Sequence, residues 1–564
     1  MEVIMKSTWW KQGVVYQIYP RSFMDSNGDG IGDLQGIISK VPYLKNLGVD
    51  IVWLCPVYGS PNDDNGYDIS DYKDIMKEFG TLADMENLID TLHNAGIRLI
   101  MDLVINHTSD EHPWFIEARS SKNSEHRDYY IWKKGKDGLP PSNWGGCFGG
   151  SAWEYDEATD EYYLHLFTKK QPDLNWNNKK VRNEIYDMVK WWLDKGIDGF
   201  RLDAINSISK EMEILEKLPQ EKTSVWAGTY FNNRPMVHEV LRELNEKVIS
   251  KYDVMTVGET PGVSPEYSML YCAPERNELN MIFHFELMDL DSAPDCKWKT
   301  KSWSLDKFKE ITSKWQEGLY NKGWNSLYLN NHDQPRMVSR FGNDRQYRNK
   351  SAKLLATLLH TLQGTPYIYQ GEELGMTNVA FETISEYRDI ETLNAYNEMV
   401  NDKGMSEGDV MQAIHMKSRD NARTPMQWDE TQNGGFTVGI PWIGVNPNYT
   451  EINARKEMSN PDSIFNYYKK LIELRKKYPI IIEGKYTLLK NYANPLYACT
   501  RENSGHIMLV ILNFSDNNTY LPSPQTKALN PEGYKLLISN YSQEEMQKEI
   551  LKPYEARVYI IDKQ

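Results

Sequence analysis

The sequence lacks the features of a membrane protein, a secreted protein or a nucleic-acid-binding protein. None of its 564 residues belongs to an apolar run of the roughly 18 residues that a membrane span needs. The first residues, MEVIMKSTWWKQGVV, show no basic segment followed by an apolar stretch and a cleavage site. The net charge is −15, whereas nucleic acids and anionic membranes require a basic face. We therefore expect a cytoplasmic protein without a membrane or nucleic-acid partner.

Cysteine is scarce as well. The five cysteines are an odd number, lie far apart, and form no close pair of the kind that binds metal: Cys55, Cys147, Cys272, Cys296 and Cys499. Reduced thiols in the cytoplasm are the simplest interpretation. Aromatic residues, by contrast, are plentiful at 12%, with 17 Trp and 35 Tyr, which fits the binding of sugar rings and also fits a well-packed core.

Eight short apolar runs, rich in β-branched and aromatic residues, recur along the chain and are mostly followed by helical patterns. They cover residues 14–20, 49–56, 97–107, 197–203, 252–259, 280–286, 325–333 and 365–373. One intervening helix is expected to begin at Thr81 with a capping box to Asp84 and to end at Gly96. Near-continuous apolar strands suit a parallel sheet buried on both faces. Eight such units predict an α/β fold, a (β/α)₈ barrel.

Two parts of the chain depart from this alternation. Residues 108–178 are rich in Trp, Gly, Pro and Tyr and predict a small domain inserted after the third strand. From about residue 485, alternating strands separated by Asn, Pro and Gly predict a C-terminal antiparallel β-sandwich. The expected domains are therefore the barrel (1–107 and 179–484), the insert (108–178) and the C-terminal domain (485–564).

The carboxyl ends of the predicted strands carry an unusual number of charged side chains. These are Asp102 and His107 on the third strand, Arg201 and Asp203 on the fourth, Glu259 on the fifth, and His332 and Asp333 on the seventh. Any one carboxylate there could simply cap the next helix. Burying several together is costly unless function requires it, and barrel active sites lie at this face. The pattern therefore predicts an active site.

The spacing of two of these groups suggests their chemistry. Arg201 and Asp203 are two residues apart on a strand, so they share a face, and the guanidinium is expected to lower the pKa of Asp203. Glu259 would lie beside other carboxylates, which raises its pKa as a general acid requires. One ionised and one protonated carboxyl group are what retaining glycoside hydrolysis needs. The alternative is a salt bridge that only stabilises the barrel.

These residues also carry a family resemblance. DLVINH (102–107), GFRLD (199–203), VGE (257–259) and NNHD (330–333) resemble the four sequence blocks of the α-amylase family of glycoside hydrolases, and QPDLNW (171–176) resembles a fifth. SRDNARTPMQW (418–428) and NDDNGYDISDY (62–72) are similar to the oligo-1,6-glucosidase and α-glucosidase branch. The similarity runs nearly end to end.

The resemblance implies roles for individual residues. Asp203 would be the nucleophile, Glu259 the acid/base and Asp333 a third carboxylate that stabilises the transition state. Three more residues would hydrogen-bond the glucose that is cleaved: His107, Arg201 and His332.

Further residues would shape the pocket for the terminal glucose. Asp64, Tyr67 and Arg419 would close its far wall, which implies exo action on short oligosaccharides. Phe148 and Phe167 of the insert would either stack against the sugar or belong to the core.

The residue after the nucleophile bears on the linkage. Relatives confined to α-1,6 bonds tend to have Val there, and maltose-cleaving relatives commonly have Thr, whereas this chain has Ala204. The missing γ-methyl groups leave space, so we expect tolerance of α-1,6 bonds together with maltose- or sucrose-type bonds.

Three alternatives share parts of this pattern. Sucrose isomerases usually carry an Arg-Leu-Asp-Arg run where this chain has SRFGNDR (339–345), which favours hydrolysis. A trehalose-6-phosphate hydrolase would need a basic cluster for the phosphate, which the sequence does not place. Non-catalytic relatives carry a membrane helix and lack the full catalytic set, whereas this chain keeps Asp203, Glu259 and Asp333.

The stretch DSNGDGIGD (25–33) predicts a calcium loop. Its candidate ligands occupy positions one, three, five, seven and nine of such a loop: Asp25, Asn27, Asp29, the Ile31 carbonyl and Asp33. The twelfth position is Gly36 instead of the bidentate Glu of an EF-hand, so the loop is not an EF-hand. We expect a structural Ca²⁺, with a plain Asx-rich turn as the alternative, no organic cofactor, and a monomer acting on small oligosaccharides.

Overall fold

The computed structural model describes residues 8–217, 224–294, 296–490, 492, 494–521 and 533–563. Its centre is an eight-stranded parallel sheet in the order β13-β12-β10-β5-β2-β1-β17-β16. The strands are β1 (Val15–Ile18), β2 (Ile51–Leu54), β5 (Arg98–Val104), β10 (Gly199–Asp203), β12 (Met255–Glu259), β13 (Met281–Phe283), β16 (Ser326–Leu327) and β17 (Thr365–Tyr369). Each lies inside a predicted run. A parallel bridge between Ile282 and Asn325 joins the two edges, so the sheet is nearly closed and the predicted barrel is confirmed.

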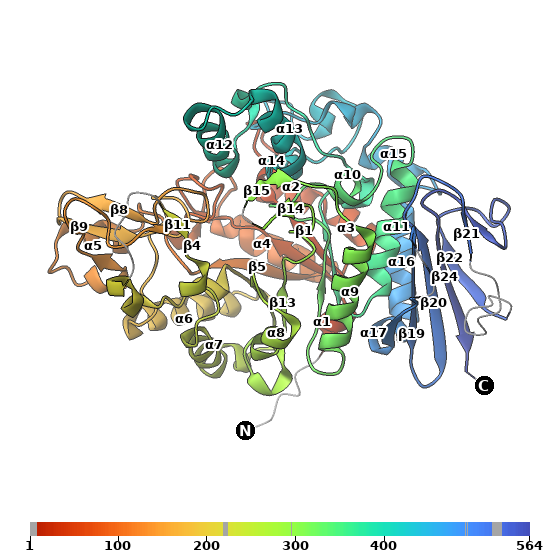
Figure 1. Cartoon of the computed structure of the whole chain (residues 1–564), viewed down its shortest axis with the longest axis horizontal. Coiled ribbons are helices and arrows are strands. Elements are labelled where there is room, and N and C mark those ends of the chain that lie inside the picture. The colour runs from red at the N-terminus through yellow and green to blue at the C-terminus, as the bar shows by residue number, and fades with distance from the viewer. Residues whose placement is uncertain are drawn as a thin grey trace.

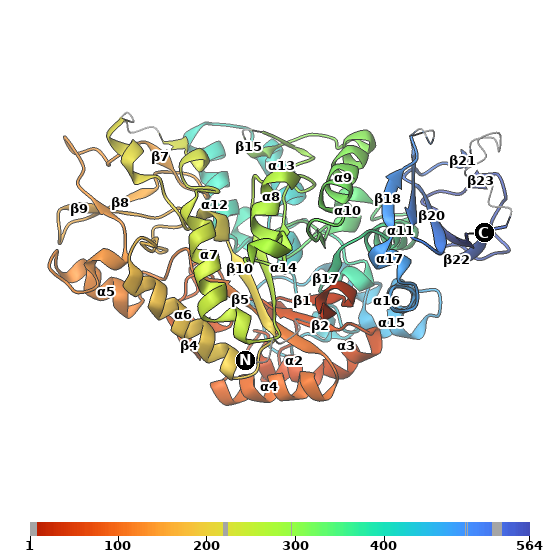
Figure 2. The same cartoon turned by 90° about the horizontal axis from the view of Figure 1, so that it is seen from below.

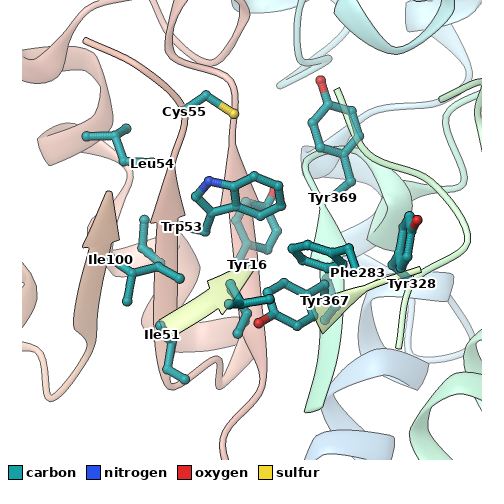
Figure 3. Packing of buried hydrophobic residues seen from close by; sticks show 14 of the residues in the cluster. Tyr16, Ile51, Trp53, Leu54, Cys55, Ile100, Phe283, Tyr328, Tyr367 and Tyr369 are labelled. Carbon is teal, nitrogen blue, oxygen red and sulfur yellow. The ribbon is translucent and has the colours of Figure 1, made fainter. Parts of the chain in front are cut away.

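The barrel interior is filled by aromatic side chains. Figure 3 shows Trp53 of β2, Phe283 of β13 and Tyr367 of β17 pointing toward one another. The Trp53 and Phe283 rings stack with centroids 5.5 Å apart, and the Phe283 and Tyr367 rings are 4.7 Å apart. All three are buried. The barrel is therefore a packed core, and the Trp53 indole N–H reaches up from it to Asp102, 3.0 Å away.

Helices surround the barrel, as the alternating pattern predicted. They include α2 (Leu34–Ser39), α3 (Val41–Leu47), α4 (Leu82–Asn94), α6 (Lys179–Asp194), α7 (Met236–Lys247), α8 (Pro265–Cys272), α9 (Leu305–Leu319), α10 (Met337–Phe341), α11 (Arg348–Thr361), α16 (Ile464–Lys477) and α17 (Ile480–Glu483). The capping box of Thr81 and Asp84 is present at the start of α4. Within the described part of the chain, no helix combines the length and the apolar character needed to cross a bilayer.

The segment between β5 and α6 forms a body of its own at one end of the molecule (Figures 1 and 2). It holds α5 (Pro113–Ser120), β6 (Trp132–Lys133), β7 (Trp144–Gly145), β8 (Trp153–Asp156) and β9 (Glu161–Leu164), with β6, β9 and β8 in one sheet. Its hydrophobic cluster also takes in Leu215, Ala227 and Phe231 from the segment after β10, because β7 pairs with β11 (Val225–Trp226).

The opposite end of the molecule is a five-stranded antiparallel sheet in the order β18-β19-β20-β24-β22 (Figure 1). Its strands are β18 (Lys485–Leu488), β19 (Leu496–Glu502), β20 (His506–Asn513), β22 (Lys535–Ser539) and β24 (Ala556–Asp562). A second antiparallel pair consists of β21 (Thr519–Tyr520) and β23 (Ile550–Leu551). All five cysteines of the chain are free thiols.

Two segments that the alternation did not predict lie between barrel elements. A hairpin of β14 (Ser292–Ala293) and β15 (Cys296–Thr300) follows β13. The long connection from β17 to α16 contains α12 (Ile390–Tyr396), α13 (Glu407–Lys417), α14 (Asp420–Arg423) and α15 (Ala454–Ser459). Both segments contribute walls to the cavity described next.

Candidate active site

A cavity of about 630 Å³ lies at the carboxyl ends of the barrel strands. Nine of the residues singled out in the sequence line it: Asp64, Tyr67, His107, Phe148, Phe167, Asp203, Glu259, Asp333 and Arg419. The other three, Arg201, Ala204 and His332, are buried next to these lining groups. The structure therefore brings the whole predicted set together around one pocket.

Arg201 is the centre of the site. Its Nη1 donates to Asp102 Oδ1 and to Asp203 Oδ1, each at 2.6 Å, and its Nη2 lies 2.7 Å from Glu259 Oε2. The three carboxylates come from β5, β10 and β12, which are neighbours in the sheet, so parallel register brings them to one edge. Because one buried guanidinium faces three carboxylates, the cluster favours keeping a proton on one of them.

Glu259 is suited to hold that proton. Burial raises its pKa to about 7, and the charge of Asp203 adds to the effect, while Arg201 opposes it. Glu259 Oε2 accepts from Arg201 and from the backbone N–H of Ala204 at 3.0 Å. With Oε2 held by two donors, the proton belongs on Oε1. A protonated carboxyl group near neutral pH is what a general acid requires.

The pKa of Asp203 differs from the sequence-based expectation. Burial raises it to about 7, and Arg201 offsets this only in part because Asp102, which shares the same Nη1, raises it further. The spacing of Arg201 and Asp203 correctly places the guanidinium beside the carboxylate, but it carries no information about burial or about Asp102. An ionised Asp203 therefore depends on Glu259 holding the proton of the pair.

Asp333, by contrast, is held ionised. Burial alone would raise its pKa, but His332 and two arginines outweigh burial and hold the pKa well below its usual range. His332 Nε2 lies 3.2 Å from Asp333 Oδ2, and Arg423 Nη2 donates to Oδ1 at 2.7 Å. A permanently charged carboxylate at this position suits stabilisation of a positively charged transition state.

His332 is fixed in orientation by its surroundings. Its ring stacks on that of Tyr67 with centroids 5.2 Å apart. The Gln17 side-chain amide lies 2.8 Å from Nδ1, and the Tyr67 hydroxyl lies 2.6 Å from Nε2 and donates to Asp102 Oδ2 at 3.1 Å. Burial lowers the pKa of His332. Tyr67 thus connects the far wall of the pocket to the cluster around Arg201.

The far wall is closed by an ion pair. Arg419 Nη2 lies 3.1 Å from Asp64 Oδ1, and the guanidinium stands 4.7 Å from the centre of the Phe148 ring. Burial raises the pKa of Asp64 to about 6, against the opposing charge of Arg419. A pocket closed on one side by buried, paired charges accepts the end of a chain and excludes its middle.

His107 and Phe167 form the adjoining wall. The His107 Nε2 atom lies 2.9 Å from the Tyr67 carbonyl oxygen, and burial lowers the pKa of His107 to about 4, so the ring is neutral. The Phe167 ring lies 5.0 Å from His107 and 5.6 Å from Phe148. Both phenylalanines line the cavity, and Phe167 also packs against the hydrophobic cluster of the insert.

Ala204 has a backbone conformation that residues with a side chain rarely adopt. Its φ is 40°, in the left-handed region. This turn directs the Ala204 N–H at Glu259 instead of along β10. The conformation follows directly after the predicted nucleophile, where strain is expected at a functional site.

Several residues around the pocket were missed by the sequence analysis. Asp389, Glu391 and Lys417 lie on or next to α12 and α13, and Lys297 lies on β15. Arg423 lies inside the SRDNARTPMQW stretch, which was the one available signal for it. The others follow no strand of the barrel, so the strand-end rule could not find them.

The predicted calcium loop holds its shape through its own hydrogen bonds. Asp25 accepts from the backbone N–H groups of Asn27, Gly28 and Gly30 and from the Thr437 hydroxyl. Asp33 accepts from Ser26 and caps α2 through Gly36 N. Within the described residues, no three His, Cys, Asp or Glu side chains group as metal ligands. The Ca²⁺ expectation stays a prediction.

Paired carboxyl groups beside a guanidinium, in a one-ended pocket at the carboxyl face of a (β/α)₈ barrel, define a glycoside hydrolase. The chain belongs to the α-amylase family, since residues 17–484 match the alpha amylase catalytic domain. Oligo-1,6-glucosidase from Parageobacillus thermoglucosidasius is 60% identical, covering 99% of this chain and 100% of that protein. Oligo-1,6-glucosidase from Bacillus cereus is 58% identical, covering 98% and 100%.

Solved structures agree with this family assignment. Trehalose-6-phosphate hydrolase from Bacillus licheniformis superposes with a TM-score of 0.91 at 49% identity, covering 99% of this chain and 100% of that one. Isomaltulose synthase from Klebsiella sp. LX3 superposes with a TM-score of 0.92 at 44% identity, covering 98% and 99%.

The pH profile follows from Glu259. With a pKa of about 7, this carboxyl group is protonated below pH 7 and loses its proton above it. We expect kcat/KM to fall tenfold per pH unit on the alkaline side of about pH 7, because Glu259 has then lost the proton that it must donate. Steady-state kinetics from pH 4 to 9 measure this. An alkaline limb that begins near pH 4.5 would contradict the raised pKa, and a Glu259→Gln variant should lack that limb.

Proposed function

We propose that the protein is an exo-acting, retaining α-glucosidase that releases glucose from the non-reducing end of short α-glucosides. The observation that carries the proposal is Arg201, which bonds both Asp203 and Glu259 inside the pocket closed by Asp64 and Arg419. Two carboxyl groups that bond one guanidinium are held close together. That arrangement suits the separation of about 5 Å in retaining enzymes better than the wider gap of inverting ones.

The reaction then proceeds in two displacements. The Asp203 carboxylate attacks the anomeric carbon while Glu259 gives its proton to the glycosidic oxygen, so the aglycone leaves as an alcohol and glucose is bound covalently to Asp203. Glu259, now ionised, takes a proton from water as the water attacks the same carbon and releases Asp203. Asp333, held ionised, faces the positive charge that develops on the sugar ring in both steps.

The proposed substrates are isomaltose-type α-1,6-glucosides together with maltose- or sucrose-type glucosides. The curated relatives named above are oligo-1,6-glucosidases, which supports α-1,6 bonds. Ala204 supports the wider range, since no γ-methyl group projects from this position.

A specificity panel tests this proposal. Isomaltose, panose, maltose, sucrose, isomaltulose and trehalose-6-phosphate are compared by kcat/KM, and NMR records the anomer first released. We expect turnover of isomaltose and of at least one of maltose and sucrose, with α-glucose formed first. An Ala204→Val variant should lose maltose and sucrose turnover by about tenfold relative to isomaltose. Hydrolysis of isomaltose alone would contradict the wider range, and β-glucose as first product would contradict retention.

The two enzyme alternatives have less support. A phosphate on the substrate would need free cations, yet Lys297 pairs with Glu391 at 2.6 Å and Lys417 with Asp291 at 2.5 Å. Of the three lysines that line the cavity, Lys301 is the exposed one, so the pocket offers a phosphate group one exposed lysine and not a basic cluster. In the SRFGNDR stretch, Arg340 of α10 pairs with Asp291 and is not among the residues that line the sugar cavity. The panel separates the alternatives, because isomaltulose formed from sucrose would indicate an isomerase.

We further propose that the DSNGDGIGD loop binds a structural Ca²⁺ through Asp25, Asn27, Asp29, the Ile31 carbonyl and Asp33. Five oxygen donors within nine residues suit this hard cation. Added Ca²⁺ should raise the melting temperature of EDTA-treated protein by a few degrees, because an ion that binds only the folded state stabilises it. Activity below the melting temperature should not change.

The exposed Asp29 offers a variant that spares the core. Asp29→Ala should abolish the calcium-dependent gain in melting temperature. An equal gain in this variant, or loss of activity on chelation without a fall in melting temperature, would contradict a structural ion in this loop.

We also propose that the enzyme is a cytoplasmic monomer. Five free thiols support a reducing compartment. Analytical ultracentrifugation checks the monomer, and cell fractionation checks the location.

A further inference from the structure

Arg419, which closes the pocket, also forms an ion pair with a carboxylate that lies outside the cavity, that of Asp389. Asp389 Oδ1 accepts from Arg419 Nε at 2.8 Å and lies 2.6 Å from Nη2. On the pocket side, Arg419 lies farther from its partners, 3.1 Å from Asp64 and 3.4 Å from Asp333. Asp389 has no exposed surface and lines no part of the cavity. Its contacts with Arg419 are therefore the closest that this guanidinium makes with a carboxylate.

The rest of Asp389 is anchored to a helix. Its Oδ2 accepts from the backbone N–H and the hydroxyl of Thr392, and its Oδ1 accepts from the N–H of Glu391, so it caps the start of α12. Glu391, in the first turn of that helix, pairs with Lys297, and both side chains line the cavity. Asp389 thus holds both Arg419 at the closed end of the pocket and the start of a helix that contributes to its lining.

Asp389 also contributes to the charge balance around Asp333. Two buried guanidinium groups, Arg419 and Arg423, face Asp333, and Asp389 lies 3.7 Å from Arg423 as well as against Arg419. Without the negative charge of Asp389, both cations would be balanced mainly by Asp333 and Asp64, with Glu391 as a more distant partner 3.6 Å from Arg419. Asp333 and Asp64 would then turn toward the arginines and away from the sugar, because a buried cation draws the nearest anion.

We infer that Asp389 is a positioning residue that holds Arg419 in the orientation that completes the glucose pocket and limits the pull of the two arginines on Asp333 and Asp64. It acts through Arg419 and never contacts the substrate. The inference rests on the proposed α-glucosidase function for its turnover readout, but its effect on the binding of glucose itself does not depend on which linkage the enzyme cleaves.

The test is the Asp389→Asn variant. Asparagine is as good a helix cap as aspartate, so its one oxygen can keep the start of α12 through Thr392. Its amide N–H₂ then faces Arg419, so the variant removes both the negative charge and the acceptor that hold this guanidinium. We expect kcat/KM for p-nitrophenyl α-glucoside to fall about 100-fold, mostly through KM, and the Kd of glucose measured by calorimetry to rise about tenfold. The matched control is Glu278→Gln, a buried carboxylate that pairs with Arg242 and Arg276 at the amino end of β13. This control should leave kcat/KM and the glucose Kd unchanged.

A double-mutant cycle shows whether Asp389 acts through Arg419. Asp389→Asn combined with Arg419→Met should be no worse than Arg419→Met alone, because the positioned group is already absent. Additive losses in the cycle, or a glucose Kd in Asp389→Asn within twofold of the wild-type value, would overturn the inference. Failure of the wild type to cleave isomaltose would instead contradict the proposed substrate and leave the glucose-binding result to decide on Asp389.

Discussion

Replacing Asp203 with alanine is expected to lower kcat by about 10⁴-fold or more, because the group that forms the covalent bond to glucose is lost. The remaining site would still bind the sugar through Asp333, Asp64 and Arg419. KM should therefore change far less than kcat. The loss should also be rescued in part by azide, a small anion that fits the space left by the carboxylate, with β-glucosyl azide as the product because only one displacement then occurs.

The control for this experiment lies directly before the same strand. Asp198 precedes β10 at the amino end of the barrel, where it pairs with Arg98 and His93 far from the cavity. Asp198→Asn should keep kcat within about twofold of the wild type. Near-normal activity of Asp203→Ala, or α-glucosyl azide as its product, would refute Asp203 as the nucleophile. Initial-rate kinetics and NMR of the azide adduct supply both measurements.

The second large effect is expected from Arg201→Met. This change removes the cation shared by the buried carboxyl groups of Asp102 and Asp203 and the half-buried one of Glu259. Breaking a buried ion pair by removing one partner typically costs about 3–5 kcal/mol of unfolding free energy. We expect a loss of this size together with loss of activity. Arg201→Lys should not restore activity, because one ammonium group cannot reach the positions of both Nη1 and Nη2.

The stability loss in Arg201→Met should depend on pH. Arg201 lowers the pKa values of Asp203 and Glu259, each of which is about 7 with it present, so both values rise further when it is removed. The unfolded chain ionises these groups near pH 4, whereas the folded variant keeps them protonated. Wild type and variant therefore lose stability alike as pH rises from about 4 to 7, because both keep these groups protonated when folded. Above about pH 7 the folded wild type ionises and the variant does not, so the stability loss of the variant should grow there and be smallest below pH 7.

Chemical denaturation at pH 6 and at pH 9 tests this prediction. The control is Arg98→Met, whose guanidinium is 39% exposed and pairs with one carboxylate, Asp198. An exposed pair of this kind is worth at most about 1 kcal/mol. A stability loss in Arg201→Met that is equal at the two pH values would contradict the cluster described here.

The barrel and two of its three proposed catalytic carboxylates follow from the sequence because the signals are local. Each strand is a compact apolar run, and Asp203 and Glu259 stand at the last positions of β10 and β12. Once parallel strands close into a barrel, the ends of those strands must meet. The last residue of each strand was therefore enough to predict that Asp203 and Glu259 lie together.

The far wall could be named only through resemblance. Arg419 lies 50 residues beyond the end of β17 in a region without strand periodicity, and Asp389 lies in the same connection. No local pattern says that such a loop folds back over the strand ends. The predicted direction of the pKa shift of Asp203 was wrong for a related reason. Its depth of burial and the position of Asp102 beside it are determined only when the strands assemble.

The aromatic packing beneath Arg201 limits the routes by which substrate and products enter and leave the cavity. Trp53, Phe283 and Tyr367 seal the barrel below the catalytic cluster, and the pair of Asp64 and Arg419 seals the far wall. Substrate and both products must use the same mouth. We therefore expect the aglycone to leave before water arrives and glucose to leave last, and we expect a second sugar at the open side of the cavity to compete with water for the glucosyl group on Asp203.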